Sequence, residues 1–207
     1  MPWRGRSFEV LRNIAEAAHV REEWPEYASF CTVYEKGLRK DAFVHLERFL
    51  CQIERAPFAE RKTFISWLLH RAEGQDGRDM LLPHPLRIRL LEPTLLEWTL
   101  VEPACAEPHR WLGDHEHLQR AVELNPCDEL ARLKLVNSLV ARVTWSTHEL
   151  PYGYLGVAHE DFASLDEAEA LLKGVSKEKD RVVWDAEITE QRELIAAYLR
   201  SKDDPKA

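Results

Sequence analysis

The chain has 207 residues, a formal net charge of −8, 45% hydrophobic residues and 31% charged residues. This length allows one substantial hydrophobic core or two smaller ones, and the composition is that of a soluble globular protein. No window approaches the roughly 18–20 apolar residues of a membrane span, and the first residues lack the apolar core of a signal peptide. We therefore expect a cytoplasmic protein with no membrane partner.

The negative charge lies entirely in the second half of the sequence. Residues 1–100 contain 15 basic and 15 acidic residues, whereas residues 101–207 contain 13 and 21. An acidic surface repels phosphates, which argues against a nucleic-acid partner. It suits a basic protein partner, although acidic surfaces also serve solubility alone.

The sequence predicts an all-α fold built as an array of antiparallel helices. Only 8 glycines occur beside many leucines, alanines and glutamates, which favours helices over strands. In the first third, apolar residues recur at helical spacing in four segments joined by short connections. With Ser7 as the cap of the first, these predicted helices are 7–20, 24–38, 41–55 and 58–73.

Residues 74–85, with two glycines and two prolines, are predicted to be a loop that links a helical array (1–73) to a second helical region (86–202). One continuous domain is the alternative. The apolar run at 80–82 within the 74–85 loop suggests that part of this loop lies against the core. Residues 86–90 alternate like a strand, but without a partner strand we expect a helix entry or an extended loop.

The second region is predicted to contain a helical hairpin at 111–140, interrupted at Pro126. Residues 103–111 and 148–161 are expected to be irregular. Ser164 and Glu167 match a capping box that starts a further helix. The remaining elements are a short helix opened by Pro93, a last helix at about 180–200 and a disordered tail at 203–207.

Residues 95–175 resemble a degenerate tetratricopeptide repeat, a 34-residue helical hairpin motif. The resemblance implies a right-handed α-solenoid in the C-terminal half. With Pro126 as the terminal proline of one unit, the matching landmarks are Trp98, Val101, Leu118 and Ala121.

No sequence motif identifies a catalytic residue or a cofactor. There is no GxSxG, Walker loop, GxGxxG or CxxC, which weakens an enzyme hypothesis without excluding it. The four cysteines lie far apart and are expected to be reduced thiols in the core or at its boundary.

A metal site is the alternative, because His109, His115 and His117 lie near Asp114 and Glu116. On a helix, residues two apart point about 200° from each other, so His115 and His117 would converge only in a non-helical turn. We therefore interpret these side chains as solvent-exposed polar residues at the start of a helix. The alternative is a metal site in a small helical metal-dependent enzyme.

Candidate binding residues follow from two patterns. In the repeat family, the first helix of each unit lines a groove, and the matching helix here carries Lys134 and Asn137; Asn137 falls where clamp-type members have asparagine. Trp145, Tyr152 and Tyr154 lie at element ends or in loops, where such side chains are either binding hot spots or caps of a helical stack.

We therefore expect a non-catalytic adaptor that binds a protein or peptide. One version is an acidic inhibitor or immunity-type protein that masks a basic effector. A homodimer, in which self-association fills an exposed apolar groove, remains an alternative.

Overall fold

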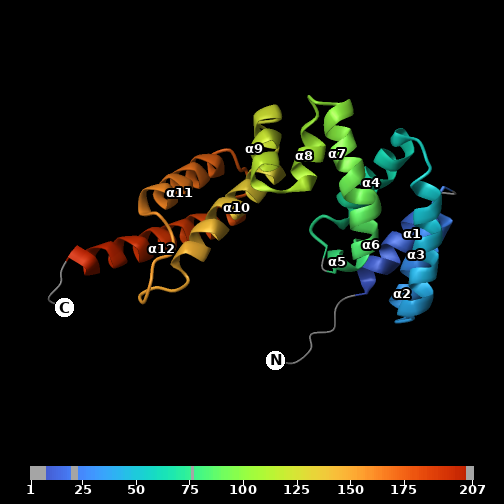
Figure 1. The fold of residues 1–207 in the computed structure, drawn as a ribbon, viewed down its shortest axis with the longest axis horizontal. Helices are drawn as coiled ribbons and strands as arrows, with labels where there is room; N and C mark the ends of the chain where they lie inside the picture. Colours follow the sequence, from blue (N-terminus) through green and yellow to red (C-terminus); the bar gives the residue numbers. More distant parts are fainter. Residues whose placement is uncertain (1–7, 20–22, 76, 204–207) are drawn as a thin grey trace. The chain divides into compact units, whose positions relative to one another are not determined.

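The computed structural model describes residues 8–19, 23–75 and 77–203, and every regular element among them is a helix (Figure 1). The predicted all-α fold is thus confirmed. None of these helices combines the length and the apolar character needed to cross a membrane. The chain divides into two compact units, Met1–Pro103 and Ala104–Ala207.

Unit 1 begins with four helices that match the predicted segments to within a few residues. The predicted cap Ser7 lies outside the described residues. The helices of this unit are α1 (Glu9–His19), α2 (Pro25–Glu35), α3 (Arg39–Ile53), α4 (Phe58–Ala72), α5 (Arg78–Leu81), α6 (His84–Leu86), η1 (Arg87–Leu91) and α7 (Glu92–Val101).

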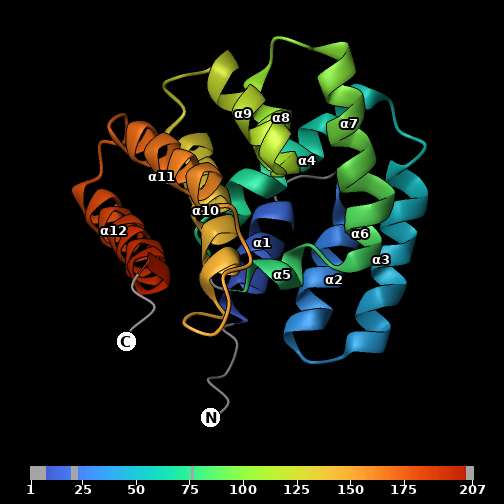
Figure 2. The ribbon, with the colours of Figure 1, turned by 60° about the vertical axis from the view of Figure 1, so that its left-hand side comes forward.

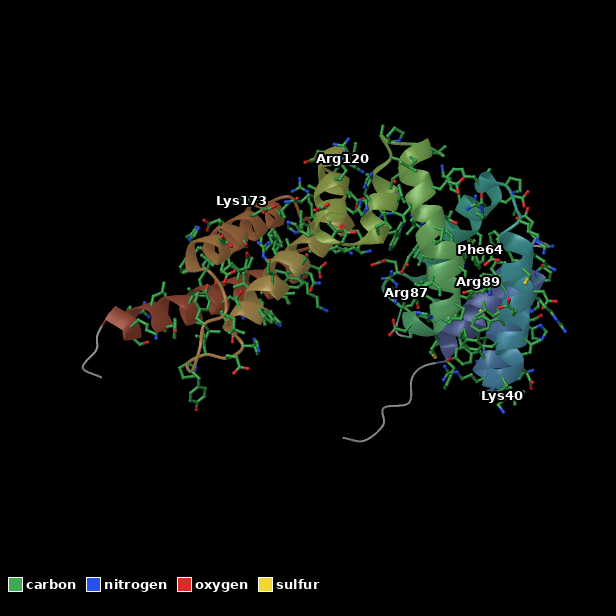
Figure 3. All side chains as sticks on the ribbon, viewed as in Figure 1. Lys40, Phe64, Arg87, Arg89, Arg120 and Lys173 are labelled. Atoms are coloured by element: carbon green, nitrogen blue, oxygen red, sulfur yellow. The ribbon has the colours of Figure 1, made fainter. Side chains whose placement is uncertain are left out.

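Aromatic side chains join α2, α3 and α4 in the core of unit 1. The ring of Phe64, labelled in Figure 3, lies with its centroid 5.0 Å from that of Tyr27 and 4.6 Å from that of Phe49. Edge-on and tilted pairs of this kind add to the free energy gained by burial. Because the three rings come from three helices, they fix the helices to one another.

The segment 74–85, expected to link two parts of the chain, lies inside unit 1. Met80, Leu81 and Leu82 are buried, and the buried hydroxyl of Tyr27 donates a hydrogen bond of 2.8 Å to the carbonyl oxygen of Leu81. The apolar run therefore anchors the segment to the core, and the division of the chain falls after Pro103.

Residues 87–91 form a π-helical turn, in agreement with a helix entry and not with a strand. Pro93 has no N–H group to donate to the carbonyl of Arg89, and the ladder widens so that the Glu92 amide bonds Arg87. The Arg89 side chain, labelled in Figure 3, reaches α3, where it donates to Glu47 (2.6 Å) and Glu54 (2.6 and 3.0 Å). These bonds raise the pKa of Arg89 and lower that of Glu47.

In unit 2, α10, the second helix of the predicted 111–140 hairpin, packs against α9, α11 and α12. Both views show α10, α11 and α12 running side by side (Figures 1 and 2). The elements of this unit are α8 (Ala106–Leu112), α9 (His115–Leu124), α10 (Glu129–Thr147), α11 (Ala158–Leu172) and α12 (Glu178–Asp203).

Several local predictions for unit 2 were wrong. Helix α8 occupies most of the segment 103–111 that was expected to be irregular. Helix α11 starts at Ala158, so Ser164 is no cap: it is buried within the helix, and its hydroxyl donates to the Glu160 carbonyl. Helix α12 continues through Asp203 into the predicted tail, whose other residues, 204–207, lie outside the described residues.

Tyr27→Phe should lower the free energy of unfolding of unit 1 by about 1–3 kcal/mol, because the buried Leu81 carbonyl loses its hydrogen-bond donor. Urea denaturation followed by tryptophan fluorescence measures the change. The matched control is Tyr34→Phe in the same helix, where the ring is only half-buried and a change below about 0.5 kcal/mol is expected. Equal losses in the two variants would contradict this role for Tyr27.

Asp128→Ala should destabilise unit 2 by about 2–4 kcal/mol, because Asp128 has two partners. Its carboxylate accepts from the Ala131 amide (3.0 Å), which caps α10, and from Arg110 (2.7 Å), with side chains only 14% and 8% exposed for Arg110 and Asp128. The control Asp114→Ala removes the exposed cap of α9 and should cost about 1 kcal/mol. If urea denaturation gave the same loss of unfolding free energy for both variants, the Arg110–Asp128 ion pair would contribute nothing to stability.

Candidate functional site

A groove between α10 and α12 is the candidate site of unit 2. It is open to solvent, has a volume of about 380 Å³ and is lined by Asn137, Val140, Ala141, Thr144, Val183, Trp184 and Glu187. The sequence produces it because α10 exposes small and polar residues at positions 137, 141 and 144, which share one face at helical spacing. Small side chains leave space where larger ones would close the gap between the helices.

The base of the groove is formed by core contacts between the two helices. Val140 is buried, Trp184 is half-buried, and both belong to or pack against the apolar core of the unit. Beside them, the buried Thr147 hydroxyl donates to the Gln191 side-chain oxygen at 2.6 Å. This hydrogen bond holds α12 against α10 and accounts for a polar residue in the apolar stripe of α12.

The walls of the groove combine apolar and acidic side chains. Val183 leaves 59% of its side-chain surface exposed although it lies beside the buried core. Glu187 accepts a hydrogen bond of 3.3 Å from the Gln191 amide. An exposed apolar surface next to an ordered carboxylate is suited to a ligand with both apolar and polar or cationic groups.

Among the predicted binding residues, Asn137 lies in the groove and Lys134 does not line it. The ammonium of Lys134 lies 4.0 Å from the ring centroid of Trp111, and the guanidinium of Arg110 lies 4.8 Å from the same centroid. Lys134 therefore contributes to a cation–π arrangement that joins α10 to α8.

The predicted aromatic residues differ in what they contact. Trp145 is 65% exposed next to the groove residue Thr144, and Tyr152 is 94% exposed in the following loop. Tyr154 is half-buried: its hydroxyl donates to Asp161 at 2.6 Å, and its ring lies 5.7 Å from that of Tyr198. Burial and this hydrogen bond raise the pKa of Tyr154. Trp145 and Tyr152 can meet a partner, whereas Tyr154 fixes the loop.

The loop after α10 is held close to the helices by Gly156. A Cβ at this position would lie 2.1 Å from Asp161 Oδ2 and 2.7 Å from the Ser146 side chain, which leaves no room for any other residue. The Leu155 amide also donates to the Ser146 carbonyl at 3.0 Å. The loop that carries Tyr152 therefore has a fixed base beside the end of the groove.

The histidines proposed as an alternative metal site come together only as a pair. His109 and His117 place their Nδ1 atoms 2.8 Å apart, so one ring donates a hydrogen bond to the other, and within the described ranges no hydrogen bond or ring contact joins the His115 side chain to this pair. Across residues 8–19, 23–75 and 77–203, no group of three or more His, Cys, Asp or Glu side chains is arranged to hold a metal ion.

The residues that sequence reasoning missed come from α12. Val183 and Glu187 were not among the candidates, and Trp184 was assigned only to an apolar stripe. The signal was the run of three apolar residues at 182–184, because a helix cannot direct three consecutive side chains toward one core. At least one of them had to remain exposed.

A scan of protein-family models finds no match to this chain. Searches of curated proteins and of solved structures find no match either. The function is therefore inferred from the site itself.

The stability of unit 2 should fall as the pH drops below about 6.5, the ordinary pKa of histidine. Burial, followed by the nearby charges of His117 and Arg120, lowers the pKa of His109 below that value, although Asp114 opposes the shift. Between the two pKa values, His109 is protonated in the unfolded chain but neutral in the folded chain. The free energy of unfolding therefore decreases as the pH falls, until the pH is below the pKa of His109 in the folded chain. His109→Gln should reduce the difference in unfolding free energy between pH 7.5 and 5.5, and the control His115→Gln should not. The same pH dependence in wild type and His109→Gln would contradict this assignment.

Proposed function

We propose that this protein is a non-catalytic adaptor whose unit 2 binds a protein or peptide segment in the groove between α10 and α12. The observation that carries the proposal is the exposed apolar wall at Val183 beside a base formed by Val140 and Trp184. Helix-lined apolar grooves bind amphipathic segments through a few anchoring side chains.

The dimensions of the groove support a peptide ligand. From Asn137 to Thr144 the wall of α10 spans eight residues, and the seven steps between them correspond to about 10 Å of helix axis. Two turns of a bound helix cover this distance. Beyond Thr144, the exposed ring of Trp145 extends the apolar surface along α10, and exposed tryptophan is a frequent binding hot spot.

We further propose that unit 2 is a short tetratricopeptide-like solenoid. Consecutive helices α9, α10, α11 and α12 each pack on the next or the next but one, which is the pairing expected of stacked hairpins. In this arrangement α10 is the groove-lining helix, in keeping with Asn137 in the groove wall. The acidic inhibitor or immunity-type role is the version in which the ligand belongs to a basic effector.

Ala141→Trp should abolish partner capture, because the indole fills the groove where only a methyl group now stands. The test is a pull-down from the native lysate with untagged protein coupled to resin, followed by mass spectrometry. Ala170→Trp, on an exposed position of α11 outside the groove, is the matched control and should retain wild-type capture. Circular dichroism checks that both variants are folded.

Three outcomes would count against an adaptor that binds its partner in this groove. Partners that bind the Ala141→Trp and wild-type proteins equally would place binding elsewhere on the chain. A stoichiometric transition metal in the untagged protein, lost in His109→Gln, would instead support the small metal-dependent enzyme. A mass in light scattering that rises with concentration and is restored to the monomer by Ala141→Trp would identify the groove as a homodimer interface.

A further inference from the structure

We infer, on the basis of the proposed function, that the ligand of the α10–α12 groove is a basic amphipathic helix whose lysine or arginine side chains pair with Glu187 and Glu190. The apolar face of that helix would lie on Val140, Val183 and Trp184.

From the groove residues Val183 and Glu187, an alternation of apolar and acidic residues continues along α12 beyond the groove lining. Val183, Glu187, Glu190 and Leu194 follow one another at spacings of four, three and four residues, which places them along one face of the helix. Val183 and Leu194 are exposed, Glu187 is half-buried and Glu190 is exposed. The two carboxylates are one helical turn apart, and an amphipathic helix can present two cations at the same spacing.

These two carboxylates are not neutralised within the protein. In the part of the chain that the structure describes, neither Glu187 nor Glu190 has an ion-pair partner, and Glu187 accepts only from the neutral amide of Gln191. On the neighbouring helix, by contrast, Asp166 and Glu169 both pair with Arg192. The groove therefore keeps a local negative charge that a cationic ligand would complement.

The opposite wall contributes no negative charge that would compete with Glu187 and Glu190. Its lining residues Asn137, Ala141 and Thr144 are uncharged. On the same helix, Arg142 reaches α11, where it donates to the Ser164 hydroxyl, and Lys134 lies one turn before Asn137 with its ammonium against Trp111. Positive charge at that end of α10 directs the cations of the ligand toward the two glutamates of α12.

A helical ligand is favoured over an extended one because both walls are helices. Backbone N–H and C=O groups within α10 and α12 are engaged in their own helices, so neither wall offers a strand edge for pairing. Recognition must then come from side chains. A helix that presents apolar residues at i, i+3 or i+4 and i+7, flanked by lysines, matches the apolar base and the acidic side of this groove.

The test measures the binding of two fluorescein-labelled 14-residue peptides to the full chain by fluorescence anisotropy. One is an amphipathic leucine–lysine helix, LKKLLKLLKKLLKL, and the other has glutamate in place of every lysine. The inference predicts saturable binding of the lysine peptide at least 10-fold tighter than that of the glutamate peptide. Its affinity should fall as salt is raised from 50 to 300 mM, because screening weakens the exposed ion pairs.

The double variant Glu187→Lys/Glu190→Lys should lower the affinity for the lysine peptide at least 10-fold. It should bind the glutamate peptide more tightly than the wild-type protein does. The matched control, Glu123→Lys/Glu167→Lys, makes the same change in net charge at two exposed positions on α9 and α11 and should change either affinity less than 3-fold. This control separates a local pairing from general attraction to an acidic protein.

Failure of the inference is distinguishable from failure of the proposed function. Equal effects of the two double variants, equal affinity for the two peptides, or no binding of the lysine peptide would each overturn the basic-helix ligand. The proposed function would still stand if Ala141→Trp abolished capture of a partner while the charge variants did not. Loss of lysine-peptide binding in Ala141→Trp but not in Ala170→Trp would support both.

Discussion

The packing of α10 against three neighbouring helices is the constraint on which unit 2 depends. Its apolar surface is wider than one neighbour can cover, and it is shared among α9, α11 and α12 in a core that includes Leu135, Leu139 and Val143. With those sides buried, the exposed stripe through Asn137, Ala141 and Thr144 lines the groove beside α12. The groove is therefore a consequence of how the central helix is covered, and its small residues keep it from closing.

Polar contacts then fix the ends of this arrangement. Asp128 caps α10 and pairs with Arg110, which ties α8 to the start of the central helix. At the other end, Thr147 bonds Gln191 of α12, and the loop lies on Ser146 through the space left at Gly156. The Thr147–Gln191 bond joins the two helices that form the groove walls, so a buried hydrogen bond fixes their spacing at that end.

Much of the helical fold could be predicted from apolar spacing, because periodicity reports which face of a helix is buried. The α2–α4 segments were predicted for this reason. The break between α9 and α10 was predicted from Pro126, because a proline cannot continue the helical hydrogen-bond ladder. Short-range motifs were less informative. The Ser164–Glu167 pair satisfies a capping pattern, yet the loop closed by Gly156 lets α11 begin six residues earlier. The loop-like composition of residues 74–85 likewise did not indicate how completely Leu81 and Leu82 are buried.

The candidate site was only partly predictable. Asn137 and Trp145 are on a helix whose exposed face can be derived from its sequence, and both are available to a ligand in or beside the groove. The α12 wall was missed because a groove is defined by two helices 40 to 50 residues apart in the chain, and pairing at that distance leaves no local pattern. Tyr154 was predicted as a binding residue, but its hydroxyl donates a hydrogen bond to Asp161 and its ring is half-buried.

The measurement that most directly tests the groove as a binding site is a two-dimensional amide NMR titration of the isotopically labelled full chain with the leucine–lysine peptide. The account predicts that the largest shift changes fall on residues 137–145 of α10 and 183–194 of α12, with little change in unit 1. Changes confined to unit 1 or to the outer face of α11, or no change at saturating peptide, would contradict it.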